Sequence, residues 1–106
     1  LMSAAGDNPY ALRISQIQNR LARNYNGSVN VPTLYSNIDV LSNNRIIIIK
    51  DLQEWEKGVG LLYIVSSMFP RNKHLHLFNV HANSQQLLNK IILVMQQLDI
   101  ILTFEQ

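Results

Sequence analysis

The 106-residue sequence contains no cysteine and little charge. The absence of cysteine excludes disulfides, thiolate nucleophiles and cysteine-rich zinc sites, and it leaves the redox compartment open. Nine Lys and Arg against seven Asp and Glu give a net charge of only +2, which is weak support for a nucleic-acid partner. No apolar run approaches the roughly 18–20 residues that span a bilayer, so we expect no membrane insertion by this segment.

Hydrophobic residues make up 47% of the chain, which is typical of a globular domain with a packed core. The length fits one domain. The sequence starts with Leu1, and its first residues lack the charged start and apolar run of a signal peptide. We therefore expect residues 1–6 to be a leader or linker, and residues 7–106 to form a single domain taken from a larger protein.

Asp7 or Asn8 followed by Pro9 predicts the start of a helix, because the polar side chain can cap it and proline suits the first turn. The helix should end near Asn26–Gly27, where glycine can take the left-handed conformation. Along it, apolar residues recur at gaps of four, three and four. They form one narrow stripe, consisting of Tyr10, Ile14, Ile17 and Leu21. We interpret the stripe as a surface for a protein partner or for self-association, with burial in the core as the alternative.

The opposite side of this helix carries three arginines. A solvated outer face is the simpler interpretation, and a site for phosphate or an acidic partner is the alternative. If the chain binds nucleic acid, we expect the contacts to come from Arg13, Arg20, Arg23, Arg71 and Lys73.

The centre of the chain carries four consecutive isoleucines, Ile46 to Ile49. An unbroken β-branched run is typical of a strand whose two faces are both covered, as in a central parallel strand. Before it, the alternation over residues 38–40 predicts a half-buried edge strand, and residues 42–44 could close a hairpin.

The second half of the chain alternates helical and strand patterns. We expect a helix over residues 52–69, a strand over 74–80, a helix beginning near residue 83 and a strand over 100–104. The sequence therefore predicts an α/β or α+β fold with an N-terminal helix, an edge hairpin, and then β-α-β-α-β with a mostly parallel sheet centred on residues 45–50.

Three histidines surround the second of these strands. His74 and His76 should share one face, whereas His81 should point away or lie in the next loop. With no cysteine and no acidic residue nearby in sequence, we expect half-exposed strand histidines and no metal site.

Motifs for enzymatic chemistry are incomplete. The strand ending at Asp51 has no phosphate loop, Gly58-Val59-Gly60 lacks the third glycine of a dinucleotide fingerprint, and Ser66-Ser67 lacks a glycine elbow. We therefore expect no catalytic residues and no cofactor.

Two family resemblances cover about half the chain. Gly58 to Leu62, with Lys73 to Val80 and the helix after Asn83, resembles the second half of a STAS domain, a non-catalytic regulatory module. In place of the Asp-Ser pair of that family stands Glu56-Lys57, so its phosphoregulation is not implied. Met68 to Pro70 and Leu75 to Val80 are similar to part of CRAL-TRIO lipid-carrier domains.

These observations predict a non-catalytic protein–protein interaction or assembly domain, regulatory or scaffolding, within a larger protein. Nucleic-acid binding through the basic helix face is the first alternative. A STAS-like or lipid-carrier-like regulatory module is the second.

Overall fold

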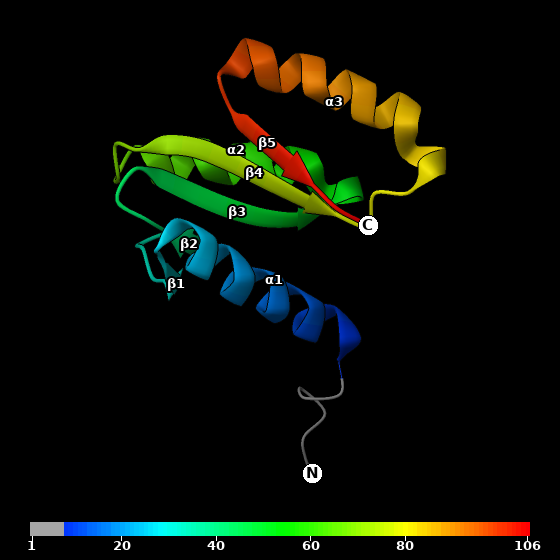
Figure 1. Ribbon diagram of the computed structural model, residues 1–106. Helices are drawn as coiled ribbons and strands as arrows, with labels where there is room; N and C mark the ends of the chain where they lie inside the picture. The colour runs from blue at the N-terminus through cyan, green and yellow to red at the C-terminus, as the bar shows by residue number, and fades with distance from the viewer. Residues whose placement is uncertain (1–7) are drawn as a thin grey trace.

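The structure, a computed structural model, describes residues 8–106, so the expected leader and a cap at Asp7 lie outside the described residues (Figure 1). The helices are α1 (Pro9–Tyr25), α2 (Trp55–Ser66) and α3 (Gln85–Leu98), with short 3-10 turns η1 (Leu52–Glu54) and η2 (Ala82–Ser84). The strands are β1 (Ser28–Val31), β2 (Ile38–Leu41), β3 (Arg45–Asp51), β4 (Asn72–Phe78) and β5 (Ile101–Phe104).

The strands form one five-stranded sheet in the order β1-β2-β3-β4-β5. The pairs β3–β4 and β4–β5 are parallel, as the predicted β-α-β-α-β order requires, and β3 is the central strand. The pairs β1–β2 and β2–β3 are antiparallel, so the sheet is mixed and the fold is α+β. The predicted hairpin into β3 is confirmed, but the edge position belongs to β1 and not to Ile38–Leu41, because Ser28–Val31 pairs along the outer side of β2.

The helices cover both faces of the sheet, with α1 on one side and α2 and α3 on the other (Figure 1). Both parallel crossovers advance in the same direction across the sheet, which places their helices on the same face. Side chains of β3 alternate between the layers: Ile46 and Ile48 pack with α2 and α3, whereas Ile47 and Ile49 pack with α1. No helix among residues 8–106 combines the length and apolar character needed to cross a bilayer.

The ends of α1 follow from local side-chain chemistry. The Asn8 side chain accepts hydrogen bonds from the backbone N–H of Tyr10, at 3.0 Å, and of Ala11. At the other end Asn26, with φ 55°, takes the left-handed conformation, not Gly27 as expected. Gly27 has a different role, because a Cβ there would lie 2.9 Å from the Leu41 carbonyl oxygen. Glycine thus allows the chain to pass close to β2.

A buried polar cluster joins α1 to the hairpin. The Asp39 carboxylate accepts a hydrogen bond from the Ile49 N–H at 2.8 Å, so a side chain replaces a backbone partner between β2 and β3. Gln18, which is buried, donates to the side-chain oxygens of Asp39, at 3.2 Å, and Asn30, at 2.8 Å. Burial raises the pKa of Asp39 above its usual value, although these hydrogen bonds and Lys50 oppose the shift.

The two glycines of α2 have opposite surroundings. A Cβ on Gly58 would lie 2.5 Å from Leu75 Cδ1, and Leu75 is fully buried, so Gly58 permits close packing of the helix on the sheet. A Cβ on Gly60 would have no atom within 4 Å. The helix expected over residues 52–69 is shorter, because residues 52–54 form the 3-10 turn η1 and α2 runs from Trp55 to Ser66.

We predict opposite effects for alanine at these two positions. Gly58→Ala should lower the free energy of unfolding by about 1–3 kcal/mol, because the buried Leu75 must move. Gly60→Ala should raise it by about 0.5–1 kcal/mol, because helical backbone entropy is reduced without a clash. Urea unfolding of both variants measures the difference, and equal stabilisation by the two substitutions would contradict the packing assigned to Gly58.

Candidate interaction surfaces

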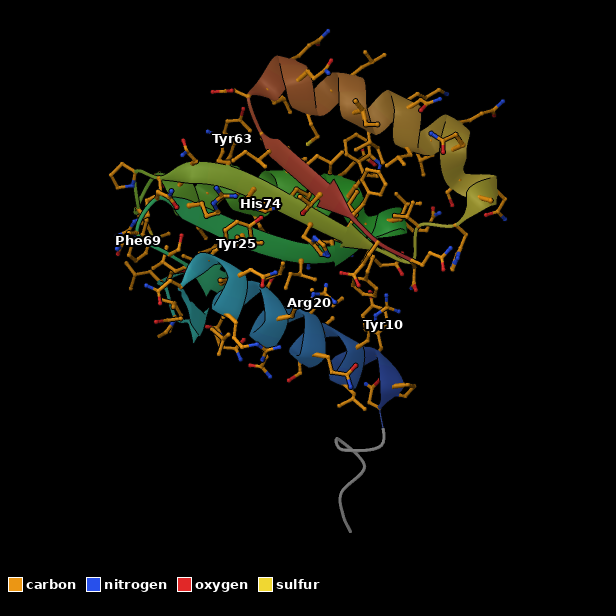
Figure 2. The ribbon with its side chains drawn as sticks, viewed as in Figure 1. Tyr10, Arg20, Tyr25, Tyr63, Phe69 and His74 are labelled. Atoms are coloured by element: carbon orange, nitrogen blue, oxygen red, sulfur yellow. The ribbon has the colours of Figure 1, made fainter. Side chains whose placement is uncertain are left out.

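The apolar stripe of α1 lies mainly within the core. Ile17 and Leu21 are buried at 1% and 5% exposure, and Ile14 packs against the same cluster. Tyr10, near the start of α1 (Figure 2), is 42% exposed, and its ring centre lies 5.4 Å from that of Phe78. The structure therefore corrects the interpretation of the stripe as a free partner surface, because α1 uses it to cover Ile47 and Ile49.

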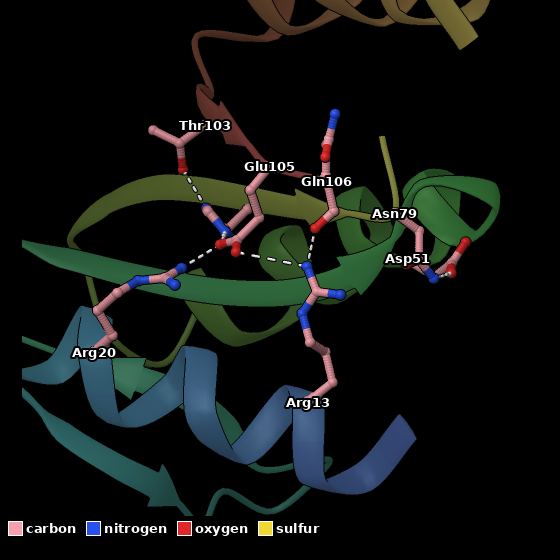
Figure 3. A network of polar contacts seen from close by, with 8 residues as sticks. Arg13, Arg20, Asp51, Asn79, Thr103, Glu105 and Gln106 are labelled. Atoms are coloured by element: carbon pink, nitrogen blue, oxygen red, sulfur yellow. Dashed lines mark hydrogen bonds and ion pairs between the residues drawn. The ribbon is translucent and has the colours of Figure 1, made fainter. Parts of the chain in front are cut away.

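The arginines of α1 are divided between a contact with the end of the chain and solvent. Arg13 and Arg20 both pair with the Glu105 carboxylate, Arg13 at 3.6 Å, and Arg13 also donates to the Gln106 carbonyl oxygen (Figure 3). Arg23 is exposed. Two of the three arginines thus share one carboxylate, which reduces the positive charge that α1 offers to a nucleic acid.

The other two expected basic residues lie elsewhere. Arg71 and Lys73 stand where β4 begins, whereas Glu105 follows the end of the parallel strand β5. Arg71 donates to the Asn43 carbonyl oxygen at 3.1 Å, and Lys73 Nζ lies 5.0 Å from the Tyr63 ring centre. They border a hollow of about 520 Å³, lined by Asn43, Asn44, Ser66, Pro70, Arg71, Asn72 and Lys73. The structure therefore does not unite the five basic residues.

A chain of hydrogen bonds runs beneath α1 from β3 to the end of β5. Arg45 Nη1 lies 3.2 Å from His74 Nδ1. Because a guanidinium can only donate, His74 Nδ1 must accept this hydrogen bond. His74 Nε2 then donates to the Thr103 hydroxyl at 2.7 Å. That hydroxyl donates to His76 Nδ1 at 2.7 Å, and His76 Nε2 donates to Glu105 at 2.6 Å. With both histidines neutral, the Arg45 guanidinium fixes the direction of the bonds of His74, and the Glu105 carboxylate, which can only accept, fixes those of His76.

The surroundings of these hydrogen-bonded side chains shift their pKa values. Burial, followed by the charges of Arg45 and His76, lowers the pKa of His74 from 6.5 to about 4. Burial also lowers the pKa of His76, although Glu105 opposes the shift. Burial alone would raise the pKa of Glu105, but hydrogen bonds from Arg20 and His76 bring it below the usual range.

The histidines differ in part from the expectation. His74 and His76 share one face as predicted, and His81 lies in the loop after β4. The strand histidines are not half-exposed, because their exposure is 0% and 4%. Within residues 8–106, no group of three or more histidine or acidic residues is placed to hold a metal ion.

A polar hollow of about 580 Å³ lies at the carboxyl ends of β3 and β4, where α/β folds often bind ligands. Its lining consists of Asp51, Gln53, Asn79, His81, Asn83, Ser84 and Leu87. The Asp51 carboxylate accepts from the Gln53 N–H at 2.9 Å and from the Asn79 amide at 2.6 Å (Figure 3). The Ser84 hydroxyl donates to Asn83 Oδ1 at 3.5 Å, and within residues 8–106 no hydrogen bond joins it to the His81 ring as a nucleophile–base pair would require.

A third surface is formed by the β1–β2 loop and α2. Leu34 is fully exposed at 101% and Tyr35 is 63% exposed. The loop is ordered by the Thr33 hydroxyl, which accepts from the N–H of Tyr35 at 3.1 Å and of Ser36 at 2.9 Å. Beside it is a hollow of about 310 Å³, lined by Tyr35, Lys50, Lys57, Gly60, Leu61 and Ile64. We refer to Leu34, Tyr35 and these lining residues as the loop–α2 surface.

Sequence reasoning missed most of these positions. Leu34 and Tyr35 follow Pro32 in a segment assigned to no element, and two apolar residues in such a segment are a signal that was available. Thr103 and Glu105 gave no signal, because their partners depend on the parallel register that places Thr103 beside His76.

Three similar proteins come from Acanthamoeba polyphaga mimivirus, and each is named as a KilA-N domain-containing protein. The first is 36% identical over 89 residues, which cover 83% of this chain and 35% of the relative. The second is 32% identical over 87 residues, covering 81% and 24%, and the third is 29% identical over 79 residues, covering 74% and 21%. This chain thus spans about a third or less of their length. No protein-family model matches the chain. No solved structure matches it either.

The buried His74 predicts acid sensitivity. Its pKa in the folded chain, about 4, lies below the unfolded value of 6.5, so the unfolded chain binds the extra proton first. The contribution of His74 is therefore complete above pH 6.5 and is lost as the pH falls towards 4, by up to about 3 kcal/mol. Urea unfolding across this range should show a flatter pH profile for His74→Gln than for the unsubstituted chain.

The matched control is His81→Gln, which changes an exposed loop histidine and should retain the original profile. A His74→Gln profile as steep as that of the unsubstituted chain would contradict the assignment.

Proposed function

We propose that this chain is a non-catalytic protein–protein interaction domain of a longer protein, and that it contacts its partner through the loop–α2 surface. The observation that carries the proposal is the exposure of Leu34 and Tyr35 on an ordered loop. Adjacent exposed apolar side chains are a feature of protein-binding sites, and tyrosine is enriched among the residues that dominate binding energy.

The order of the loop favours binding. The Thr33 hydroxyl accepts two backbone hydrogen bonds within the turn, which limits the conformations that Leu34 and Tyr35 would lose on association. Pre-organisation lowers the entropic cost of binding, so a small apolar contact area gives more affinity.

Several charged side chains outside the loop–α2 surface are engaged by other residues of the same chain. Arg13 and Arg20 are engaged by Glu105, and Asp51 is engaged by Gln53 and Asn79. These groups stabilise the contacts between elements of this chain. The mimivirus relatives are several times longer than the matched segment, which is consistent with a domain that acts together with other parts of its protein.

Replacing the two apolar side chains of the loop should weaken partner binding without unfolding the chain. A displayed library of short peptides selected on the immobilised chain should yield binders that lose about tenfold or more affinity for a variant carrying Leu34→Ser and Tyr35→Ser. Both side chains are exposed, so the urea midpoint should change little.

The control is Leu93→Ser, which removes an apolar side chain of 61% exposure from α3. Binders should retain their affinity for it. If no selected peptide distinguishes the loop variant from the control, the proposed function is wrong.

A second function, nucleic-acid binding, is favoured by one observation. The hollow beside Arg71 and Lys73 combines two cationic side chains with three asparagine amides, which are groups that contact phosphates, sugars and base edges. We therefore place this alternative at the start of β4 and not on α1.

For this alternative, Arg71→Gln with Lys73→Gln should weaken binding of a labelled mixed-sequence DNA duplex. Removing two phosphate contacts should reduce the slope of log affinity against log salt by about 2. Fluorescence anisotropy between about 50 and 200 mM salt measures the slope, with Arg23→Gln as the control on α1. Binding that does not vary with salt, or a slope lost in Arg23→Gln alone, would exclude this site.

A further inference from the structure

We infer that the partner bound at the loop–α2 surface presents a short acidic segment with a large apolar side chain that enters the hollow beside Gly60. This inference rests on the proposed function and specifies the chemistry of the partner. It follows from the shape of the hollow and from the charges at its border.

Gly60, an exposed residue of α2, contributes no side chain to the lining of the hollow. A Cβ on Gly60 would have no atom within 4 Å, and Gly60 lines the hollow together with the side chains of Leu61 and Ile64. Ile64 is 38% exposed although it is apolar. On the loop side, Tyr35 contributes an aromatic ring. The volume of about 310 Å³ is at the lower end of the range of ligand pockets and suits one or two large apolar side chains.

Both charged residues that line the hollow are lysines. Lys57 pairs with Glu54 at 3.1 Å, but the Lys57 side chain is 72% exposed and that of Glu54 is 40% exposed, so this pair is weak and exchangeable. No ion pair joins Lys50 to a carboxylate of residues 8–106 within 4.0 Å. The stem of Lys50 lies against Gly58, 3.2 Å from the position of a Cβ there, which holds the side chain beside α2.

These charges select among possible occupants. A second copy of this surface would bring lysines towards lysines, which is unfavourable. A nucleic acid would satisfy the lysines but would place phosphates beside Leu61 and Ile64. An acidic segment with an apolar anchor satisfies both the lysines and the apolar walls, with the carboxylates remaining at the solvated border.

The test uses three defined pools of labelled short peptides and the intact chain. The first pool has Leu or Phe anchors flanked by Glu, the second replaces Glu by Lys, and the third replaces the anchors by Ser. Fluorescence anisotropy should show binding of the first pool only. A variant with Lys50→Glu and Lys57→Glu should weaken that binding by about tenfold or more and should favour the second pool.

Gly60→Phe adds an aromatic ring to the lining of the hollow and should abolish binding of the acidic pool. The variant should still fold, because a Cβ on residue 60 has no atom within 4 Å. Gln97→Phe, which adds the same ring at an exposed position of α3, is the matched control and should bind as the unsubstituted chain does.

The outcomes separate this inference from the proposed function. Library binders that depend on Leu34 and Tyr35 but are unaffected by the lysine reversal or by Gly60→Phe would overturn the acidic-segment inference and leave the interaction function standing. The absence of any loop-dependent binder would overturn both. Preference for the Lys pool by the unsubstituted chain would overturn the assigned charge of the partner.

Discussion

The fold depends on a central strand that is apolar on both faces. Ile46 and Ile48 require cover from one side, and Ile47 and Ile49 require it from the other. The crossovers on either side of β4 supply α2 and α3, but both lie on the same face, so the remaining face must be covered from outside the β-α-β-α-β unit. The N-terminal helix meets this requirement. Most of its apolar stripe, including Ile17 and Leu21, is therefore committed to the core.

Beyond β3, the sheet face beneath α1 carries polar side chains. Their hydrogen bonds engage charged side chains of α1. Thr103 connects the two buried histidines, and Glu105 connects them to the arginines of α1. Both ring nitrogens of His74 and of His76 have hydrogen-bond partners, which makes two buried histidines compatible with a stable domain. The same contacts reduce the positive charge that α1 presents to solvent, because Arg13 and Arg20 both pair with Glu105.

The sequence was sufficient for features that depend on local periodicity. It predicted α1, the hairpin, β3 as the centre and the order of the following elements, because each of these is set by spacing along the chain. It could not predict which side of α1 would be free, because that depends on how many helices cover each face. The chain of hydrogen bonds through Thr103 depends on the register between strands far apart in sequence. The open space at Gly60 depends on the tertiary packing around α2.

The Asp39 carboxylate has a consequence for how the β1–β2 hairpin is attached to the sheet. β2 shares only the pairs Val40–Ile47 and Leu41–Ile46 with β3, whereas β3 is in register with β4 along its whole length. The Asp39 side chain supplies the next link, so the hairpin that carries the loop is attached to the central strand by few bonds. Because Ile38 and Val40 of β2 are fully buried, the attachment of this hairpin depends on side-chain packing and on the Asp39 carboxylate more than on backbone pairing. Loss of the Asp39 carboxylate would remove at once the acceptor for the Ile49 N–H and one of the two acceptors for Gln18, and so would loosen the hairpin from both β3 and α1.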